Sequence, residues 1–441
     1  MKAARIALRI LVFTATTHGV DAELDPVMQY WPQWRGPLST GESPLGTPPV
    51  SWSEEENIAW KTKLPGSGHS SPIVWANKVF LTAVQPKGKN LPVPEQPKGA
   101  HNNLDPTHKL SFLVLCMDMS EGRILWQREV RLAQPHQSTH ETGTWASASP
   151  VTDGERVYAF FGSNGLYCLD YNGTLLWEKD FGDMEVKHGH GEGASPALGE
   201  EVLVINWDHE GDSFVVALDS KKGKELWRKP RDEPTSWASP IIAEVDGKTQ
   251  VIVSGTKAVR GYELKSGKVV WSCGGLSNNV VASPVYSDGR LYAGSSYEKQ
   301  AMLALDLSKA KGQLEGTDHV IWARSRRTPY VPSPLLYGKH LYFLRHYQAI
   351  LCRLAADTGA EPTGPFRLPG LLNLYASPVA ANGRIYLVDQ QGSTLVLSNK
   401  ATPEPLSINR LKDSFNASPA IAGNSILLRG AQYLYRLAEP E

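Results

Sequence analysis

Long apolar runs, clustered cysteines and an excess of either charge are all missing from this 441-residue sequence. No internal stretch is long and apolar enough to predict a transmembrane helix. The four cysteines, Cys116, Cys168, Cys273 and Cys352, form no CxxC, CxxCH or adjacent pair. This spacing excludes recognisable zinc ribbons and c-type haem attachment, and favours buried free thiols. Lys+Arg and Asp+Glu both total 45, so no charge excess predicts binding to nucleic acid or an anionic membrane.

Residues that make turns are plentiful instead. The chain has 39 glycines, 31 prolines and 13 tryptophans but only 6 methionines. With 41% hydrophobic residues, the composition is that of a globular protein built from short strands and tight turns. No helical periodicity separates the strands, so the expected fold class is all-β.

The first residues resemble an export signal. Lys2, Arg5 and Arg9 give a positive start, residues 10–17 are mostly apolar, and residues 20–22 match a small-x-small cleavage site. We therefore predict a signal peptide over residues 1–22, an N-terminal extension over 23–56, and a periplasmic or secreted location.

A Ser-Pro dipeptide recurs along the rest of the chain. Its prolines are Pro72, Pro150, Pro196, Pro240, Pro284, Pro334, Pro378 and Pro419. Six of the seven gaps are 41–50 residues, the period of a β-propeller blade. The longer first gap holds a Pro/Lys/Asn-rich stretch over residues 85–109, which indicates a surface insertion in the first blade. The pattern predicts an eight-bladed propeller over residues 57–438.

Each repeat contains four short strands, and the fourth carries an aromatic or apolar anchor. The anchors are Trp126, Trp177, Trp227, Trp271, Trp322, Phe366 and, approximately, Ile408. The last repeat stops before such a strand, whereas residues 57–64 supply one near the N-terminus, with Trp60 placed 12 residues before Pro72. We therefore expect the N-terminal strand to complete the eighth blade, leaving no open sheet edge.

The segment Ala217–Trp227, with the pattern Ala-x-Asp-x-x-x-Gly-Lys-x-x-Trp, resembles the tryptophan-docking motif of pyrroloquinoline quinone (PQQ) repeat propellers. The resemblance covers about residues 57–438 and includes the quinoprotein alcohol-dehydrogenase-like superfamily. Residues 31–37 and 52–57 resemble uncharacterised secreted bacterial PQQ-like propellers, and the chain as a whole is most similar to these and to BamB-like assembly factors. The resemblance to PQQ repeat propellers implies that the tryptophans pack between neighbouring blades, against turns that contain glycine.

The resemblance leaves function open between two classes. A BamB-like protein would be a non-catalytic binding or scaffolding module for a protein or polysaccharide partner in the cell envelope. The alternative is a PQQ-dependent (quinoprotein) dehydrogenase-type oxidoreductase that uses PQQ with calcium. The alcohol-dehydrogenase type places an adjacent-cysteine disulfide against the cofactor, and this chain has no adjacent cysteines. No catalytic or cofactor-binding residue is carried over, so the sequence favours the binding module, expected as a monomer without a membrane span.

Two linkers that lead into neighbouring inner strands carry candidate metal ligands. His188, His190 and Glu192 alternate onto one side if their segment is extended, and His136 and His140 lie in the preceding linker. Two imidazoles and a carboxylate suit zinc or another transition metal. Solvated glycine-rich loops are the other interpretation of the same residues.

Aromatic residues also precede several Ser-Pro steps. Trp145, Trp237, Tyr330 and Tyr375 lie one to four residues before the corresponding Ser-Pro step. They could ring a channel mouth and stack on a sugar or planar ligand, or they could pack between blades.

Overall fold

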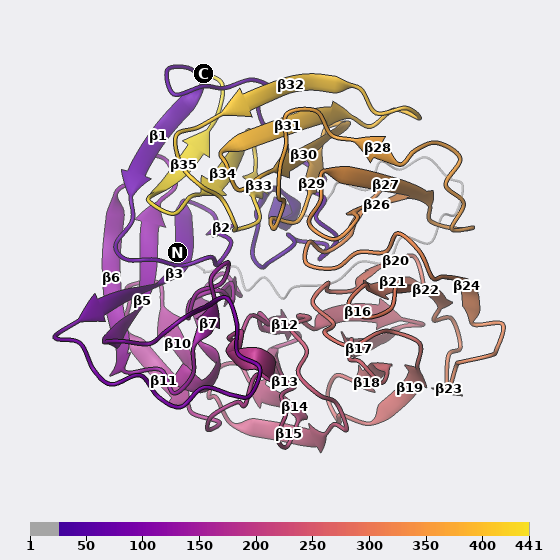
Figure 1. Ribbon diagram of the computed structural model, residues 1–441, viewed down its shortest axis with the longest axis horizontal. Helices are drawn as coiled ribbons and strands as arrows, with labels where there is room; N and C mark the ends of the chain where they lie inside the picture. Colours follow the sequence, from indigo (N-terminus) through magenta and orange to yellow (C-terminus); the bar gives the residue numbers. More distant parts are fainter. Residues whose placement is uncertain (1–25, 441) are drawn as a thin grey trace, which may run out of the picture.

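The computed structural model describes residues 26–440, and the predicted signal peptide over 1–22 lies outside them. Eight four-stranded antiparallel sheets, one of them with a fifth strand, form a closed ring around a central axis (Figure 1). This confirms the predicted all-β, eight-bladed propeller. We number the blades from the first sheet after the N-terminal strand.

The innermost strand of every blade begins directly after a Ser-Pro step. From the axis outward, blades 1 to 4 are β2(Ile73–Trp75), β3(Lys78–Lys87), β5(Lys109–Asp118), β6(Ile124–Ala133); β8(Val151–Thr152), β9(Arg156–Phe160), β10(Leu166–Asp170), β11(Leu175–Lys179); β12(Ala197–Gly199), β13(Val202–Trp207), β14(Phe214–Asp219), β15(Glu225–Pro230); and β16(Ile241–Val245), β17(Lys248–Val253), β18(Val259–Glu263), β19(Val269–Cys273).

Blades 5 to 8 repeat this order. They are β20(Val285–Ser287), β21(Arg290–Ser295), β22(Ala301–Asp306), β24(Val320–Arg324); β25(Leu335–Tyr337), β26(His340–Leu344), β27(Ile350–Ala355), β28(Phe366–Arg367); β29(Val379–Ala381), β30(Arg384–Val388), β31(Ser393–Ser398), β32(Pro405–Arg410); and β33(Ala420–Ala422), β34(Ser425–Arg429), β35(Tyr433–Leu437), β1(Ile58–Lys63). Short elements outside the blades are η1(Pro26–Gln29), β4(Asn103–Leu104), β7(Thr139–His140), η2(Gly162–Asn164), η3(Lys187–Gly189) and β23(Gly312–Gln313).

The serines of the Ser-Pro steps link the inner strands to one another. The backbone N–H of each donates to the hydroxyl of the next at 2.8–2.9 Å, in the order Ser71, Ser149, Ser195, Ser239, Ser283, Ser333, Ser377, Ser418. All eight serines are buried. The buried N–H of each donating serine needs a hydrogen-bond partner, and the hydroxyl of the serine in the next blade supplies it. The proline that follows each serine has no N–H, so it is tolerated at the start of an edge strand.

Tryptophans of the outer strands lock neighbouring blades together. The indole N–H of Trp177 donates to the carbonyl of Ser220 at 2.9 Å, and its ring covers Gly223 of the next blade, where φ is +64°. A side chain at Gly223 would meet the ring at 2.6 Å, so only glycine fits. The same pair recurs as Trp60–Gly122, Trp126–Gly173, Trp227–Gly267 and Trp322–Gly359. The docking implied by the sequence resemblance is thus present.

Blade 4 departs from this pattern. Its Trp271 donates to the side chain of Gln250 in the same blade and covers Gly261. The extra strand β23 comes from an extension of blade 5 and pairs in parallel with β19, with Trp271 opposite Gly312. In the other blades that carry such a tryptophan, its ring covers a glycine turn of the next blade. In blade 4 the extension of blade 5 takes the place of that turn.

The ring closes between the two ends of the chain. Strand β1 pairs antiparallel with β35, with Lys63 opposite Tyr433, as the sequence predicted. The indole of Trp60 then docks onto blade 1, donating to Met119 at 2.9 Å. Blade 8 is therefore built from both ends of the chain.

Hydrophobic clusters lie between blades. One cluster joins Tyr158 and Cys168 of blade 2 to Leu203 and Val216 of blade 3. A larger one joins blades 7, 8 and 1. All four cysteines are free and buried, which confirms the interpretation from spacing. Because each blade packs against its neighbour, the hydrophobic core lies between the blades and extends around the ring.

The N-terminal segment after η1 crosses one mouth of the ring. Its backbone pairs with inner strands of several blades, for example Trp31 with Val74 and Ser43 with Ala380. Arg35 is buried and donates to the carbonyls of Pro334 and Pro378 at 2.8 and 2.7 Å. We call this side, which also carries the turns between inner and second strands, the turn face.

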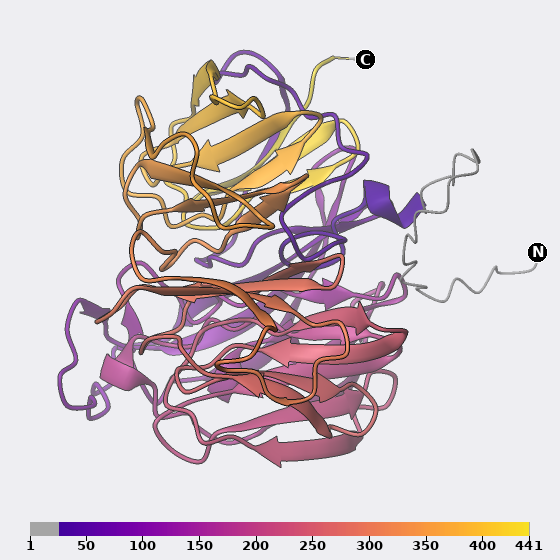
Figure 2. The same cartoon turned by 90° about the vertical axis from the view of Figure 1, so that its right-hand side faces the viewer.

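The opposite side is the linker face, where each outer strand connects to the next blade. Figure 2 shows η1 on one side of the ring and the blade 1 loop with η3 on the other. No helix in the described chain is long and apolar enough to cross a membrane.

Candidate functional site on the linker face

The blade 1 loop between Lys87 and Lys109 folds over the linker face. Its strand β4 pairs with β7 of the first linker, with Asn103 opposite His140. The Asn103 amide donates to the Ser138 hydroxyl at 2.8 Å and to the carbonyl of His188 at 2.9 Å. The loop therefore binds together the linkers that enter blades 2 and 3, and brings their polar residues to one place.

Four histidine rings meet at this junction. The centroid of His101 lies 5.2 Å from that of His188 and 4.8 Å from that of His190. His190 is 5.4 Å from His188 and 4.8 Å from His140. The sequence predicted three of these histidines as metal ligands in neighbouring linkers and missed His101, which comes from the blade 1 loop.

The expected extended segment with alternating ligands is wrong. Residues Lys187–Gly189 form the 3₁₀ turn η3, in which His188 has φ of 58°. Gly189 and Gly191 also have positive φ, so the chain turns repeatedly where alternation needs a straight strand. As a result His188 and His190 face His101, while Glu192 points elsewhere.

Burial lowers the pKa of the clustered imidazoles. For His190 the pKa falls to about 4, first through desolvation and then through the neighbouring histidines. Burial also lowers the pKa of His188, which lies next to Lys187, and that of His140. With their pKa lowered, these rings are neutral at pH 7, so each has one nitrogen that can accept a hydrogen bond or bind a metal ion.

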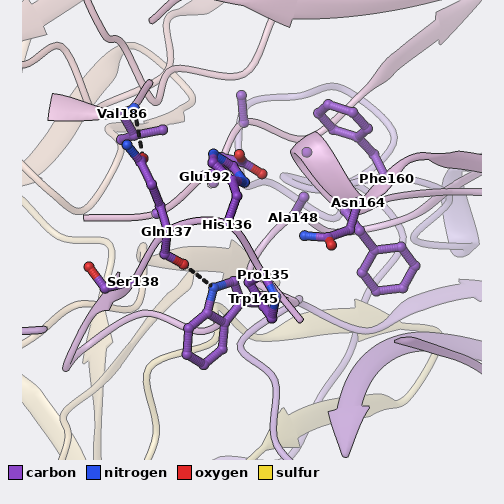
Figure 3. A pocket seen from close by; sticks show the side chains of 15 residues that line it. Pro135, His136, Gln137, Ser138, Trp145, Ala148, Phe160, Asn164, Val186 and Glu192 are labelled. Atoms are coloured by element: carbon purple, nitrogen blue, oxygen red, sulfur yellow. Dashed lines mark hydrogen bonds between the residues drawn. The ribbon is translucent and has the colours of Figure 1, made fainter. Parts of the chain in front are cut away.

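Glu192 and His136 belong to a separate pocket of about 430 Å³, counting its solvent-open space (Figure 3). The Glu192 carboxylate accepts hydrogen bonds from the N–H and hydroxyl of Ser163. Burial raises its pKa. His136 contacts the Met184 carbonyl at 2.8 Å through Nε2. These two predicted ligands are thus held apart from the histidine junction.

The predicted aromatic residues divide into two kinds. The Trp145 indole donates to the carbonyl of Gln137 at 3.0 Å, and that of Trp237 donates to Gly191 at 2.7 Å. Trp237 thus joins two neighbouring linkers, whereas Trp145 bonds within its own linker and lines the Glu192 pocket. Both indoles therefore fix the linkers in place.

Tyr330 and Tyr375 belong to an aromatic arc over blades 5 to 7. Neighbouring ring centroids along the arc are 5.2–6.3 Å apart, in the order Tyr297, Tyr330, His346, Tyr347, Tyr375. Tyr347 is 38% exposed, and Leu372, on the linker that carries Tyr375, is 65% exposed. The sequence missed three members because they lie in hairpin loops, away from the Ser-Pro steps.

The resemblance implies oxygen ligands for calcium and an adjacent-cysteine disulfide beside PQQ. Three buried carboxylates of the linker face accept hydrogen bonds from the chain's own donors: Glu192 from Ser163, Glu233 from Arg260 and Asp208 from Arg231. Between residues 26 and 440, no group of three or more His, Cys, Asp or Glu residues stands arranged to hold a metal ion. The separated, buried cysteines supply no adjacent-cysteine disulfide either.

The closed ring, the serine links and the docked tryptophans define a PQQ-like repeat propeller. The family model described as outer membrane protein assembly factor BamB matches residues 111–363 and 212–439. The chain belongs to that family. No curated protein matches the sequence.

Solved structures share the fold at low identity. The crystal structure of BamB from Moraxella catarrhalis is 14% identical, with a TM-score of 0.52 over 82% of this chain and 98% of that one. A europium-containing methanol dehydrogenase is 10% identical, with a TM-score of 0.63 over 92% and 90%. Quinohemoprotein alcohol dehydrogenase from Comamonas testosteroni is 11% identical, with a TM-score of 0.64 over 94% and 82%. At such identities the likeness concerns the fold alone.

Proposed function

We propose that this chain is a non-catalytic binding module that holds a protein partner on its linker face in the bacterial cell envelope. The observation that carries the proposal is the aromatic arc on that face, of which Tyr347 is exposed, together with the exposed Leu372. The export-type N-terminus and the BamB description of the family model support the same proposal.

The chemistry of the arc suits protein recognition. Tyrosine is enriched at the energetic centres of protein interfaces because it combines a large apolar face with a hydroxyl and few rotatable bonds. Tyr347 and Tyr375 are stacked with an angle of 9° between their planes, so each ring is held in position before a partner arrives. A preordered aromatic surface loses less entropy on binding.

The two faces of the ring differ in how much of their surface is covered by other parts of the chain. The turn face is crossed by the N-terminal segment, whose backbone hydrogen bonds occupy inner strands such as those at Val74 and Ala380. The arc has no such cover from residues 26–440, since Tyr347 and Leu372 are exposed. The linker face is therefore the surface that can accept a partner.

Site-specific photo-cross-linking tests the proposal. A photoreactive residue at position 372 should give a discrete protein adduct in the envelope of the source bacterium. The same probe at Lys339, exposed in a turn of blade 6 on the turn face, should give none. Absence of an adduct at 372, or equal adducts at both positions, would contradict a partner on the linker face.

The captured partner then allows a quantitative measurement. Tyr347→Ala and Leu372→Ala should each weaken its binding by about tenfold, because truncation of a central interface residue costs about 1–2 kcal/mol. Lys339→Ala should leave the dissociation constant unchanged. Saturable binding of a polysaccharide that the arc variants abolish would assign a glycan instead, and saturable binding of added PQQ with calcium would favour the oxidoreductase.

A further inference from the structure

We propose that His101, His188 and His190 form a binding site for one divalent transition-metal ion of the zinc class on the linker face. This site goes beyond the proposed partner binding and does not depend on it. It replaces the grouping expected from the sequence, because Glu192 and His136 lie in their own pocket. His101, from the blade 1 loop, takes their place.

Separate segments of backbone hold the three rings together. The N–H of His140 donates to the carbonyl of His190 at 3.1 Å, and the Ser138 hydroxyl donates to that of Gly189 at 2.9 Å. Asn103 joins the blade 1 loop to His188 from the other side. These hydrogen bonds therefore hold the backbone around the three histidines in place.

The spacing of the rings suits a common metal ion. The three centroid separations among His101, His188 and His190 are 5.2, 4.8 and 5.4 Å. With metal–nitrogen bonds of about 2.0–2.1 Å, tetrahedrally placed imidazoles have ring centres about 5 Å apart. All three pairs lie near this separation, and the ring of His140 lies 4.8 Å from that of His190.

The ring nitrogens point to the same ligand set. His188 Nδ1 and His190 Nε2 are buried and have no hydrogen-bond partner within residues 26–440. The backbone of Gly99 near His188, and that of His101 near His190, raises the pKa of each ring, but burial lowers it by more. These two neighbouring imidazole nitrogens are therefore open to a metal ion.

The hydrogen bonding of His101 leaves one of its ring nitrogens free to bind the same metal ion. Its Nδ1 lies 2.7 Å from the carbonyl of Gly99, so Nδ1 carries the proton and Nε2 keeps its lone pair. A metal-binding histidine typically donates its other ring N–H to a backbone carbonyl in this way. His140 differs, because its Nδ1 accepts the N–H of Thr142 at 3.2 Å and its Nε2 therefore carries the proton.

As the rings stand, their nitrogens are not gathered around one point. His101 is exposed, so its ring can turn toward an ion already held by His188 and His190. Imidazole ligands select zinc, copper, nickel or cobalt over calcium and magnesium, which prefer oxygen. Three histidines leave a fourth coordination position for water.

Metal titration of the untagged, chelator-treated full chain tests the site. One Zn²⁺ should bind per chain and raise the unfolding temperature. Co²⁺ should give the visible absorption of a four-coordinate ion with nitrogen ligands. His101→Ala, His188→Ala and His190→Ala should each weaken Zn²⁺ binding by more than about 100-fold, since even outer residues around a metal contribute 10–100-fold.

His108→Ala is the matched control, because His108 lies in the same loop and contacts Thr107 outside the cluster. It should leave the affinity unchanged. A measurement that needs no variant is protection of His101 from chemical acylation by Zn²⁺. The proposal is overturned if the wild type binds none of Zn²⁺, Cu²⁺, Ni²⁺ or Co²⁺ saturably, if the His188→Ala/His190→Ala double variant binds with wild-type affinity, or if Zn²⁺ leaves His101 fully reactive.

Discussion

Replacing Trp60 by alanine is expected to lower the free energy of unfolding by about 3–5 kcal/mol, the usual cost of deleting a buried large aromatic side chain. The indole is 8% exposed, donates to the Met119 carbonyl and covers Gly122. It also anchors β1, which completes blade 8, onto blade 1. Its loss therefore weakens both the docking contact and ring closure. Urea unfolding followed by tryptophan fluorescence and circular dichroism measures the change.

Lys63→Ala in the same strand is the control. Lys63 is exposed, so its removal should change stability by no more than about 0.5 kcal/mol. A double-mutant cycle with Gly122→Ala sharpens the test. In the wild type the added methyl would meet the indole at 2.4 Å, whereas in Trp60→Ala only the strain of φ at +73° remains. Additive effects, or a Trp60→Ala loss as small as that of Lys63→Ala, would refute the closure role.

Asp208→Asn is expected to destabilise the protein by about 3–5 kcal/mol, because it leaves a buried guanidinium without its counter-ion. Both side chains of the Asp208–Arg231 pair are 0% exposed. The carboxylate accepts two hydrogen bonds from Arg231, at 2.7 and 3.1 Å, and one from Ser236. Arg231 also donates to the Tyr262 hydroxyl at 2.8 Å, so the pair ties blade 3 to blade 4. The shift in denaturation midpoint reports the loss.

The same blade offers an exposed pair for comparison. Glu225 and Arg228 are 42% and 39% exposed at 2.8 Å, so Glu225→Gln should cost less than about 1 kcal/mol. Equal losses from the two substitutions would show that burial adds nothing to the Asp208 pair. Replacing Asp208 and Arg231 together by apolar residues of similar size should restore much of the stability, since the desolvation cost of the charges disappears.

Much of the fold could be predicted from the sequence because every blade repeats the same local chemistry. Proline is tolerated where the innermost edge strand begins, and the serine before it supplies the link to the next blade. The tryptophan and glycine spacings follow from docking between blades. The sequence did not predict β23, because its parallel pairing with β19 depends on an extension unique to one blade.

The candidate site was harder to predict, for a topological reason. The sequence located His188 and His190 but assumed a straight segment, although the glycines at 189 and 191 were already a sign of turning. His101 joins them only because β4 folds across to β7. The arc members Tyr297 and Tyr347 likewise come from hairpins whose proximity depends on the order of blades around the ring.

The pairing of β1 with β35 also imposes an order on biosynthesis. Lys63 must remain unpaired until Tyr433, 370 residues later, has been made. At about 5–20 residues per second, synthesis of the intervening segment takes roughly 20–75 s, so the ring cannot close before then. An early strand and an unfinished last sheet would then both expose free edges that can pair with other chains. The nascent protein is therefore most prone to aggregation just before completion, when a chaperone that shields either edge would improve its yield most.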